Sequence, residues 1–298
     1  MIKQERVSFL GPPGTYSYET AVSHFNPSTH EFINQKSIND VFDSVRSKEA
    51  DYGVIPFENS TYGSVLQTLD YFVLNSKLSD SKGNYLNQKH HTSFLIDFII
   101  HAEHFLNVHH CLLSISNLND IEKVYSHPEA LGQCSDWLSK HLPHAQRIPV
   151  GSTSQGAEMA AKEFGSASIS SVVCADLFKL NIIAQNIENI SNNTTRFFII
   201  GSEMAKPTGH DETLVMFTLN HNQSGTLCDA LAIMKKFNLN LTKIDSRPSG
   251  QNLWHYMFFM EFEGHVLDED VKLAMNELCV VCQEVVVLGS YESKRNAS

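Results

Sequence analysis

Three short polar segments hold the side chains that could do chemistry. The apolar run 53–57 predicts a buried strand, and the triplet Glu58-Asn59-Ser60 follows it directly. A second apolar run ends at Ser126, and Gln133 follows one helical turn beyond Glu129. Open α/β sheets bind ligands beyond the carboxyl ends of their strands, so both segments predict a ligand site.

The third segment, Thr195-Arg196-Phe197, opens a strongly apolar run. A threonine hydroxyl can donate a hydrogen bond, and a guanidinium binds a carboxylate through two parallel hydrogen bonds. The chain has only six arginines, so an arginine beside an apolar strand is notable. The alternative for Arg196 is a surface ion pair.

The segment from Gly11 to Thr15 predicts a turn between a strand and a helix. Backbone N–H groups at a helix start can hold a carboxylate or phosphate. The segment matches neither the G-x-G-x-x-G pattern of dinucleotide sites nor a P-loop, so neither kind of site is supported. A plain connecting turn is the alternative.

Cysteine and histidine spacing gives no metal site. Cys279 and Cys282 form a C-x-x-C inside an apolar run without a second pair, so core packing is preferred over redox or metal chemistry. The pairs His90-His91 and His109-His110 stand in polar, irregular sequence, and we expect them in solvated loops. All six cysteines are expected to be free thiols.

Strand-like and helix-like segments alternate as far as residue 201 and predict an α/β fold with a largely parallel sheet. Within it we expect a strand over 94–100, a helix opening at 128–141 and a polar insertion over 76–91. The polar stretch 201–211 predicts a linker. The order then changes to β-α-β-β-α-β, the ferredoxin-like pattern. We therefore expect an N-terminal α/β domain over 1–205 and a small C-terminal domain over 206–298.

Charge and hydropathy exclude several classes of protein. The 298 residues carry 22 Lys and Arg against 33 Asp and Glu, a net charge of −11. So acidic a chain is poorly suited to nucleic acid or anionic lipid, and an anionic substrate would need a local positive pocket. No window of 18 uninterrupted apolar residues predicts a membrane span, and no signal peptide is evident. We expect a cytoplasmic location.

Taken together, the motifs resemble the prephenate dehydratase family with its C-terminal ACT regulatory domain. The matching segments are Gly11-Pro12-Pro13-Gly14-Thr15-Tyr16-Ser17, Gly53 to Ser60 with Gly63-Ser64-Val65, Tyr125 to Cys134, and Thr195-Arg196-Phe197. They follow the family's order and spacing over 7–201. The ACT part is similar over 213–291, including Leu241-Thr242-Lys243-Ile244 followed by Ser246-Arg247-Pro248.

The resemblance implies that prephenate loses carbon dioxide and hydroxide to give phenylpyruvate, on the route to phenylalanine, with no cofactor and no metal. Thr195 would donate a hydrogen bond to the departing oxygen, while Asn59, Ser60 and Gln133 orient the substrate. Arg196 would anchor the pyruvyl carboxylate. The further substrate-binding residues implied are Phe197, Thr15, Ser126 and Glu58.

The implied catalytic fold has two α/β lobes with a cleft between them, like a periplasmic binding protein. The chain would cross between lobes near Asn75 to His91 and return near Ala184. The segment Ser76 to His91 looks longer than is usual in the family, and Glu129 stands where glutamine is common; we expect Glu129 to point outward.

In the ACT domain the resemblance implies feedback inhibition by phenylalanine, bound at subunit interfaces of a homodimer or homotetramer. The implied effector residues are Gly225, Thr226, Leu227, Asp245, Ser246, Arg247 and Pro248. They depart from the family motifs P-G-A-L and E-S-R-P by Pro to Ser at Ser224, Ala to Thr at Thr226, and Glu to Asp at Asp245. These changes leave the strength of inhibition and the effector preference open, and a purely structural dimerisation domain is the alternative.

Three other functions are alternatives to this one. Arogenate dehydratase performs the same chemistry on the amino-acid analogue, and the sequence leaves that choice open. A bifunctional enzyme with chorismate mutase is not expected, because only six residues precede Val7. A two-lobed solute-binding or amino-acid-sensing protein is the alternative of a different class; Thr195 and Arg196 favour the enzyme.

Overall fold

A computed structural model describes residues 4–75, 98–250 and 253–295 of the chain. These residues form two compact units. Unit 1 is made of Met1–Val41, Val54–Gly63 and Phe105–Phe197, and unit 2 of Phe42–Gly53, Ser64–His104 and Phe198–Ser298. The strands β3 (Tyr52–Asn59), β5 (Ile99–Asn107) and β11 (Thr194–Gly201) contribute residues to both units.

Unit 1 contains the N-terminal β-α-β element of the chain. The strand β1 (Glu5–Leu10) pairs in parallel with β2 (His30–Gln35), and α1 (Tyr16–His24) connects them. The sheet order in this unit is β5-β11-β3-β1-β2. The neighbours β11 and β3 bring Thr195 and Asn59 to adjacent strand ends.

A second, five-stranded sheet completes unit 1, in the order β10-β6-β9-β7-β8. The pairs β7–β8 and β7–β9 are parallel, whereas β6–β9 and β10–β6 are antiparallel, so this sheet is mixed and not largely parallel as expected. Its strands are β6 (Cys111–Ser114), β7 (Lys123–Ser126), β8 (Gln146–Pro149), β9 (Ser166–Ser170) and β10 (Asn181–Ala184).

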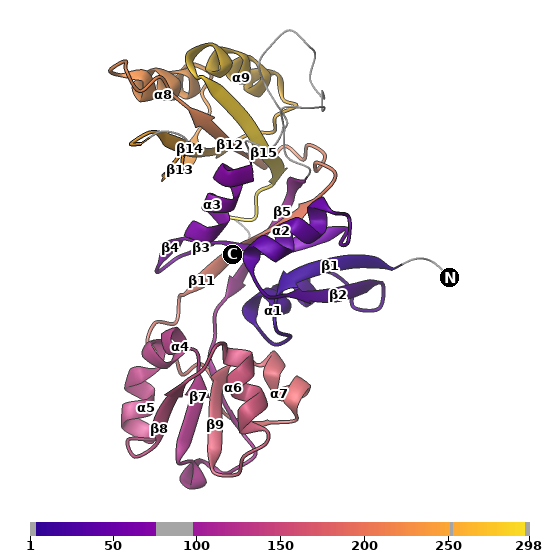
Figure 1. The fold of residues 1–298 in the computed structure, drawn as a ribbon, viewed down its shortest axis with the longest axis vertical. Helices are drawn as coiled ribbons and strands as arrows, with labels where there is room; N and C mark the ends of the chain where they lie inside the picture. Colours follow the sequence, from indigo (N-terminus) through magenta and orange to yellow (C-terminus); the bar gives the residue numbers. More distant parts are fainter. Residues whose placement is uncertain (1–3, 76–97, 251–252, 296–298) are drawn as a thin grey trace. The chain divides into compact units, whose positions relative to one another are not determined.

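Helices cover both faces of the five-stranded sheet (Figure 1). Leu112 packs with α4 (Pro128–Gln133) and α5 (Ser135–His141), while its neighbours Cys111 and Leu113 pack with α6 (Thr153–Ala160) and α7 (Val173–Phe178). Successive residues of a strand point to opposite faces, which places the two helix pairs on opposite sides. A single 3-10 turn, η1, covers Leu118–Asp120.

Unit 2 holds the C-terminal domain, whose order is the predicted β-α-β-β-α-β. Its elements are β12 (Asp211–Thr218), α8 (Thr226–Lys236), β13 (Leu241–Pro248), β14 (Tyr256–Glu263), α9 (Glu269–Val281) and β15 (Glu284–Glu292). The sheet order is β13-β14-β12-β15, and β15 also pairs in parallel with β5 at Gly289 and Ile100. An apolar core that includes Phe217, Ile233 and Leu278 joins the sheet to α8 and α9.

One helix and part of another from the first half of the chain also belong to unit 2. The helix α2 (Ile38–Arg46) contributes Phe42, whose ring stacks on Tyr71 of α3 (Leu66–Asn75) at 4.0 Å between centroids. Phe72 of α3 contacts Phe259 of β14 at 6.3 Å. The short strand β4 (Gly63–Ser64), paired with β3, leads into α3.

The structure differs from the predicted elements in several places. The strand expected over 94–100 is β5, Ile99–Asn107, and the helix expected over 128–141 is two helices that meet at Cys134. The strands β2 and β8 were missed because both carry many polar residues. The crossing expected near Asn75 to His91 falls almost wholly outside the described residues. Among the described elements, the chain enters the five-stranded sheet after β5, and it leaves after β10, which ends at Ala184, where the return was expected. The proposed insertion over 76–91, with His90 and His91, lies outside the described residues.

None of the helices in the described ranges is long and apolar enough to cross a membrane.

Candidate active site

Asn59 organises the turn that follows β3. Its side-chain oxygen accepts hydrogen bonds from the backbone N–H groups of Thr61, at 2.9 Å, and Tyr62, at 3.0 Å. This side-chain-to-backbone pattern is an Asx turn, which asparagine forms readily. Because its oxygen is fixed in this way, its NH2 group must point back toward the strand ends.

The NH2 group of Asn59 reaches two residues that lie more than 130 positions later in the chain. It donates to the Asn193 side-chain oxygen at 2.8 Å and to the Thr195 hydroxyl oxygen at 3.0 Å. Thr195 therefore uses a lone pair to accept, and its own hydroxyl proton remains for donation. In the described part of the chain, no acceptor contacts that hydroxyl.

Ser60 holds β3 and β11 in register beside this pair. Its backbone N–H donates to the Thr194 carbonyl at 2.9 Å, and the Thr194 N–H donates to the Ser60 hydroxyl at 2.9 Å. The Ser60 hydroxyl also lies 3.4 Å from the Asn192 carbonyl. Ser60 thus holds the backbone of Thr194, next to Thr195, and its contribution to the predicted site is structural.

A pocket in unit 1 opens next to Asn59 and Thr195. It is lined by Thr61, Tyr62, Gly132, Gln133, Glu188, Asn189, Ile190 and Asn193. Gln133 is half-buried, and its side-chain nitrogen lies 3.5 Å from the Tyr62 hydroxyl. Of the sequence-predicted residues, Gln133 lines this pocket. Asn59 does not line it but is hydrogen-bonded to two lining residues, Asn193 and Thr61, and Thr195 is joined to them through Asn59.

His110 lies behind Gln133, although the sequence predicted a solvated loop for it. Its ring is buried, with Nε2 at 2.6 Å from the Gln133 Oε1 and Nδ1 at 2.7 Å from the Tyr16 hydroxyl. That prediction failed because the segment 108–110 looks polar, yet β5 and β6 turn it inward. A histidine directly before the apolar run 111–113 was the one available signal.

Glu188 is the acidic group of the pocket wall. Its side chain is 3% exposed, and its oxygens accept from His109 Nδ1 at 2.8 Å and from the His110 N–H at 2.9 Å. Burial alone would raise the pKa of Glu188, but these hydrogen bonds outweigh it and lower the pKa. The carboxylate is ionised, with both oxygens satisfied by the adjacent histidine segment.

Arg196 is placed away from this pocket. Its residue is 2% exposed, and its guanidinium lies over the rings of Phe57 at 5.5 Å and Phe105 at 5.6 Å. Side chains alternate along a strand, so Arg196 points to the sheet face opposite Thr195. The local positive charge expected from the sequence is absent from the described residues that line the pocket. Phe197 is buried in the core.

The remaining predicted substrate residues have local structural contacts. The Thr15 hydroxyl caps α1 by accepting from the Tyr18 N–H and donates to the Leu10 carbonyl at 2.8 Å. Ser126 is fully buried, and its hydroxyl donates to the Ile169 carbonyl at 2.5 Å. Glu58 is half-buried at the end of β3. Glu129 is exposed in the first turn of α4.

Comparison with known protein families shows which family the chain belongs to. The model of the family described as prephenate dehydratase matches residues 7–205, and the ACT domain model matches 213–280. The chain belongs to the prephenate dehydratase family. It is an enzyme of that family with an ACT domain, and the predicted α/β fold is confirmed.

Individual relatives agree with the family match. The chain is 39% identical to a bifunctional chorismate mutase/prephenate dehydratase of Aquifex aeolicus, over 97% of this chain and 74% of that protein. It is 32% identical to a prephenate dehydratase of Amycolatopsis methanolica, over 96% and 88%. A solved prephenate dehydratase of Arthrobacter aurescens, in complex with L-Phe, is 27% identical with a TM-score of 0.82, over 97% and 90%.

The ACT domain of this family member carries the predicted effector residues in two segments. Gly225 precedes α8 with φ +85, the left-handed region that favours glycine, and an added Cβ there would meet open space. Thr226 is buried, and Leu227 packs against the domain core. In the described part of the chain, no hydrogen bond or ion pair joins this segment to the other, Asp245 to Pro248.

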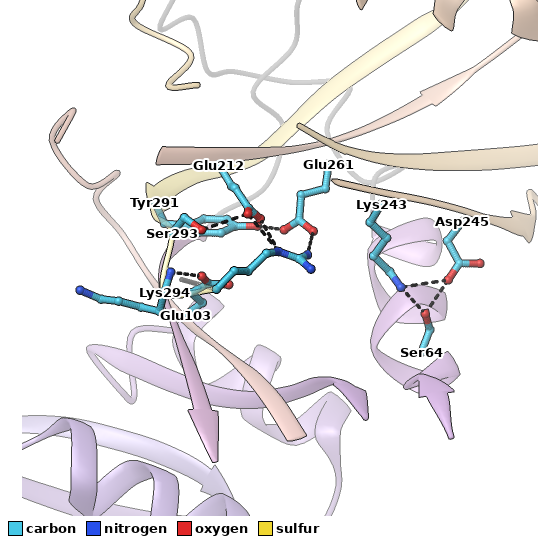
Figure 2. Close-up of polar contacts among 10 residues, drawn as sticks. Ser64, Glu103, Glu212, Lys243, Asp245, Glu261, Tyr291, Ser293 and Lys294 are labelled. Carbon is cyan, nitrogen blue, oxygen red and sulfur yellow. Dashed lines mark hydrogen bonds and ion pairs between the residues drawn. The ribbon is translucent and has the colours of Figure 1, made fainter. Parts of the chain in front are cut away.

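The second effector segment contacts the region that follows the Asn59 turn. Ser64 donates to Asp245 at 2.6 Å and accepts from Lys243 at 2.8 Å, as Figure 2 shows. Arg247 binds Asp70 of α3 bidentately, at 2.6 and 2.9 Å. Residues 243, 245 and 247 alternate along β13 and so share one face. Ser246 and Pro248, between and after them, are exposed.

The six cysteines are all free, as expected, and Cys282 is buried in the ACT core with Cys279 packed against it. Among the described residues no group of three or more His, Cys, Asp or Glu could hold a metal ion.

Proposed function

We propose that this enzyme converts prephenate to phenylpyruvate at the site formed by Asn59, Thr195 and Gln133, under feedback control by phenylalanine. The observation that carries the proposal is the Asn59–Thr195 hydrogen bond of 3.0 Å. It leaves the threonine proton for donation, close to the pocket-lining residue Asn193, in a chain that belongs to the prephenate dehydratase family.

The reaction needs little beyond a hydrogen-bond donor to the departing oxygen and a surface that orients the substrate. The bond from the ring to its carboxylate breaks and releases carbon dioxide, and the electron pair enters the ring as the ring hydroxyl leaves. The departing oxygen takes up a proton and becomes water. A preorganised donor stabilises the charge that develops on that oxygen, and Thr195 is placed for this role. The ring becomes aromatic, so the drive lies in the substrate and orientation is the enzyme's main contribution.

Asn59 makes the Thr195 donor directional. Its two side-chain hydrogens are committed to Asn193 and Thr195, and its oxygen to the turn. An asparagine with every group engaged cannot rotate without losing several hydrogen bonds. Asn59 therefore acts by fixing the threonine, and Ser60 by fixing the strand register.

Prephenate carries two carboxylates, yet the residues lining the pocket include no lysine or arginine in the described ranges. Neutral donors from Thr61, Asn193 and Gln133 are the groups available to bind them. A site without a strong cation also leaves the departing carboxylate less stabilised, which favours its loss as carbon dioxide.

Phenylalanine control is proposed to act through the ACT domain, and the L-Phe complex of the Arthrobacter aurescens relative supports this. We propose a homodimer or homotetramer in the cytoplasm. The strand β13 is the edge strand of the ACT sheet, and edge strands pair readily with a second chain. Leu253 and Trp254, after β13, expose 87% and 84% of their surface, which further supports an interface there.

Incubation of the purified protein with prephenate or arogenate, with product read by phenylpyruvate absorbance in alkali or by amino-acid analysis, tests the proposal. We expect turnover of prephenate that falls as phenylalanine is added. Binding of phenylalanine without turnover of either substrate would favour the amino-acid-sensing alternative. Turnover of arogenate alone would change the substrate and keep the site.

A further inference from the structure

His110 is a buried titratable group beside the proposed site that the mechanism above does not use. Its residue is 2% exposed, and each ring nitrogen has a partner from a different element: Tyr16 of α1 and Gln133 of α4. The Tyr16 ring also meets the His110 ring edge to face, with centroids 5.7 Å apart. The imidazole is therefore held in one position and one orientation.

The two hydrogen bonds select one tautomer. The Gln133 Oε1 can only accept, so its contact of 2.6 Å with Nε2 places the ring proton on Nε2. The Nδ1 atom then accepts from the Tyr16 hydroxyl at 2.7 Å, and that hydroxyl also lies 3.1 Å from the His109 carbonyl. A neutral imidazole that accepts at Nδ1 carries its proton on Nε2. Burial raises the pKa of Tyr16 and lowers that of His110, which keeps the hydroxyl protonated and the ring neutral.

The tautomer of His110 and the orientation of the Gln133 amide are linked. With the proton on Nε2, His110 donates to the amide oxygen, and the NH2 group turns toward Tyr62 and the pocket. With the proton on Nδ1, Nε2 would attract the NH2 group, and the pocket would receive a carbonyl oxygen instead. For an anionic substrate the first arrangement is attractive and the second repulsive.

Resting on the proposed function, we propose that His110 is a positioning residue: with Tyr16 it holds Gln133 as a hydrogen-bond donor toward a substrate carboxylate. The pocket's described lining lacks a lysine or arginine, so an oriented neutral donor carries more of the recognition there. The chain Tyr16–His110–Gln133 thus links the first family motif to the third.

Kinetics of the full-length enzyme test this coupling. His110→Asn places an amide near the Nδ1 position, keeps an acceptor for Tyr16 and removes the donor to Gln133. We expect kcat/KM for prephenate to fall about tenfold to a hundredfold, the effect of losing one hydrogen bond to a charged group. Because His110 acts through Gln133, the double variant with Gln133→Ala should fall no further than Gln133→Ala alone. Fully additive losses would overturn the proposal.

A spectroscopic measurement separates this inference from the proposed function. Nitrogen-15 NMR of labelled protein, with the His110 signal assigned by its loss in His110→Asn, should show a neutral ring protonated on Nε2. In Tyr16→Phe, which keeps the ring packing, both tautomers should appear. A ring protonated on Nδ1 in the parent overturns the proposal whether or not prephenate is turned over. His144→Asn, an exposed histidine of the same unit, is the control and should keep the parent kinetics.

Discussion

Replacing Thr195 with valine removes one hydroxyl from the site and keeps the β-branched shape that suits a strand. The protein itself should tolerate the change. Asn59 keeps its bond to Asn193 at 2.8 Å, and its second hydrogen lies in a half-buried place that water can reach. We expect a loss of unfolding free energy of about 1 kcal/mol or less, the usual net value of one hydrogen bond.

The effect on catalysis should be much larger. If the hydroxyl stabilises the departing oxygen, its loss should lower kcat by about 10²- to 10³-fold, which corresponds to roughly 2.7–4 kcal/mol. Two neighbouring hydroxyls provide a matched pair. The Thr194 hydroxyl donates to Asn107 at 2.8 Å and is expected to take no part, so Thr194→Val should retain the parent kcat. Thr195→Ser should recover most of the activity.

Initial rates of phenylpyruvate formation and thermal melts of all three variants give the comparison. A Thr195→Val enzyme within twofold of the parent kcat would remove the hydroxyl from the mechanism. Equal losses in Thr194→Val and Thr195→Val would show that the strand end, and not the donor, is what matters.

Three arginines make buried or bidentate contacts that can be tested by substitution. Arg196→Met should lower the melting temperature by the loss of its two aromatic contacts, with KM within twofold of the parent; a large rise in KM with unchanged melting would restore Arg196 as the carboxylate anchor. Asp70→Asn breaks the bidentate contact with Arg247. We expect the phenylalanine concentration for half inhibition to rise about fivefold, with the uninhibited rate unchanged. An unaltered inhibition curve would exclude this contact from regulation. Arg295→Met removes the guanidinium that pairs with two buried carboxylates, Glu212 and Glu261. We expect the free energy of unfolding, measured by urea denaturation, to fall by about 3 kcal/mol. A fall below about 1 kcal/mol would show that the hydrogen bonds from Ser293 and Tyr291 are enough to stabilise the two carboxylates.

The buried carboxylate cluster illustrates a feature that sequence reading passed over. Glu212 and Glu261 occupy neighbouring strands of the ACT sheet and are 1% and 0% exposed. Arg295 and Tyr291, from the C-terminal segment, supply their donors, and Figure 2 shows the carboxylates and the tyrosine together. A glutamate inside a strand pattern is normally predicted to face solvent. The pattern of one strand does not show that an arginine more than thirty residues later in the chain will pair with it.

The order of elements was predictable because it depends on local patterns. The β-α-β-β-α-β order of the ACT domain, the strand–turn–helix around Thr15 and the strand into Asn59 all follow from apolar spacing within about ten residues. The motifs led to the family on the same basis, and the family matches confirm it. The division at residue 205 stays a prediction.

Tertiary structure alone decided which of the singled-out residues meet. Asn59 and Thr195 are 136 positions apart, and Tyr16 and His110 are 94 apart, so their contacts depend on strand neighbours and helix packing that no local pattern specifies. The same non-local pairing turned Arg196 away from the pocket and brought His110 to its wall. The sequence by itself determined which residue types were available to the site. Which of them can act together was determined by the register of β3 against β11 and by the packing of α1 and α4 around His110. The physical reason is that the strand or helix that carries a side chain sets its direction.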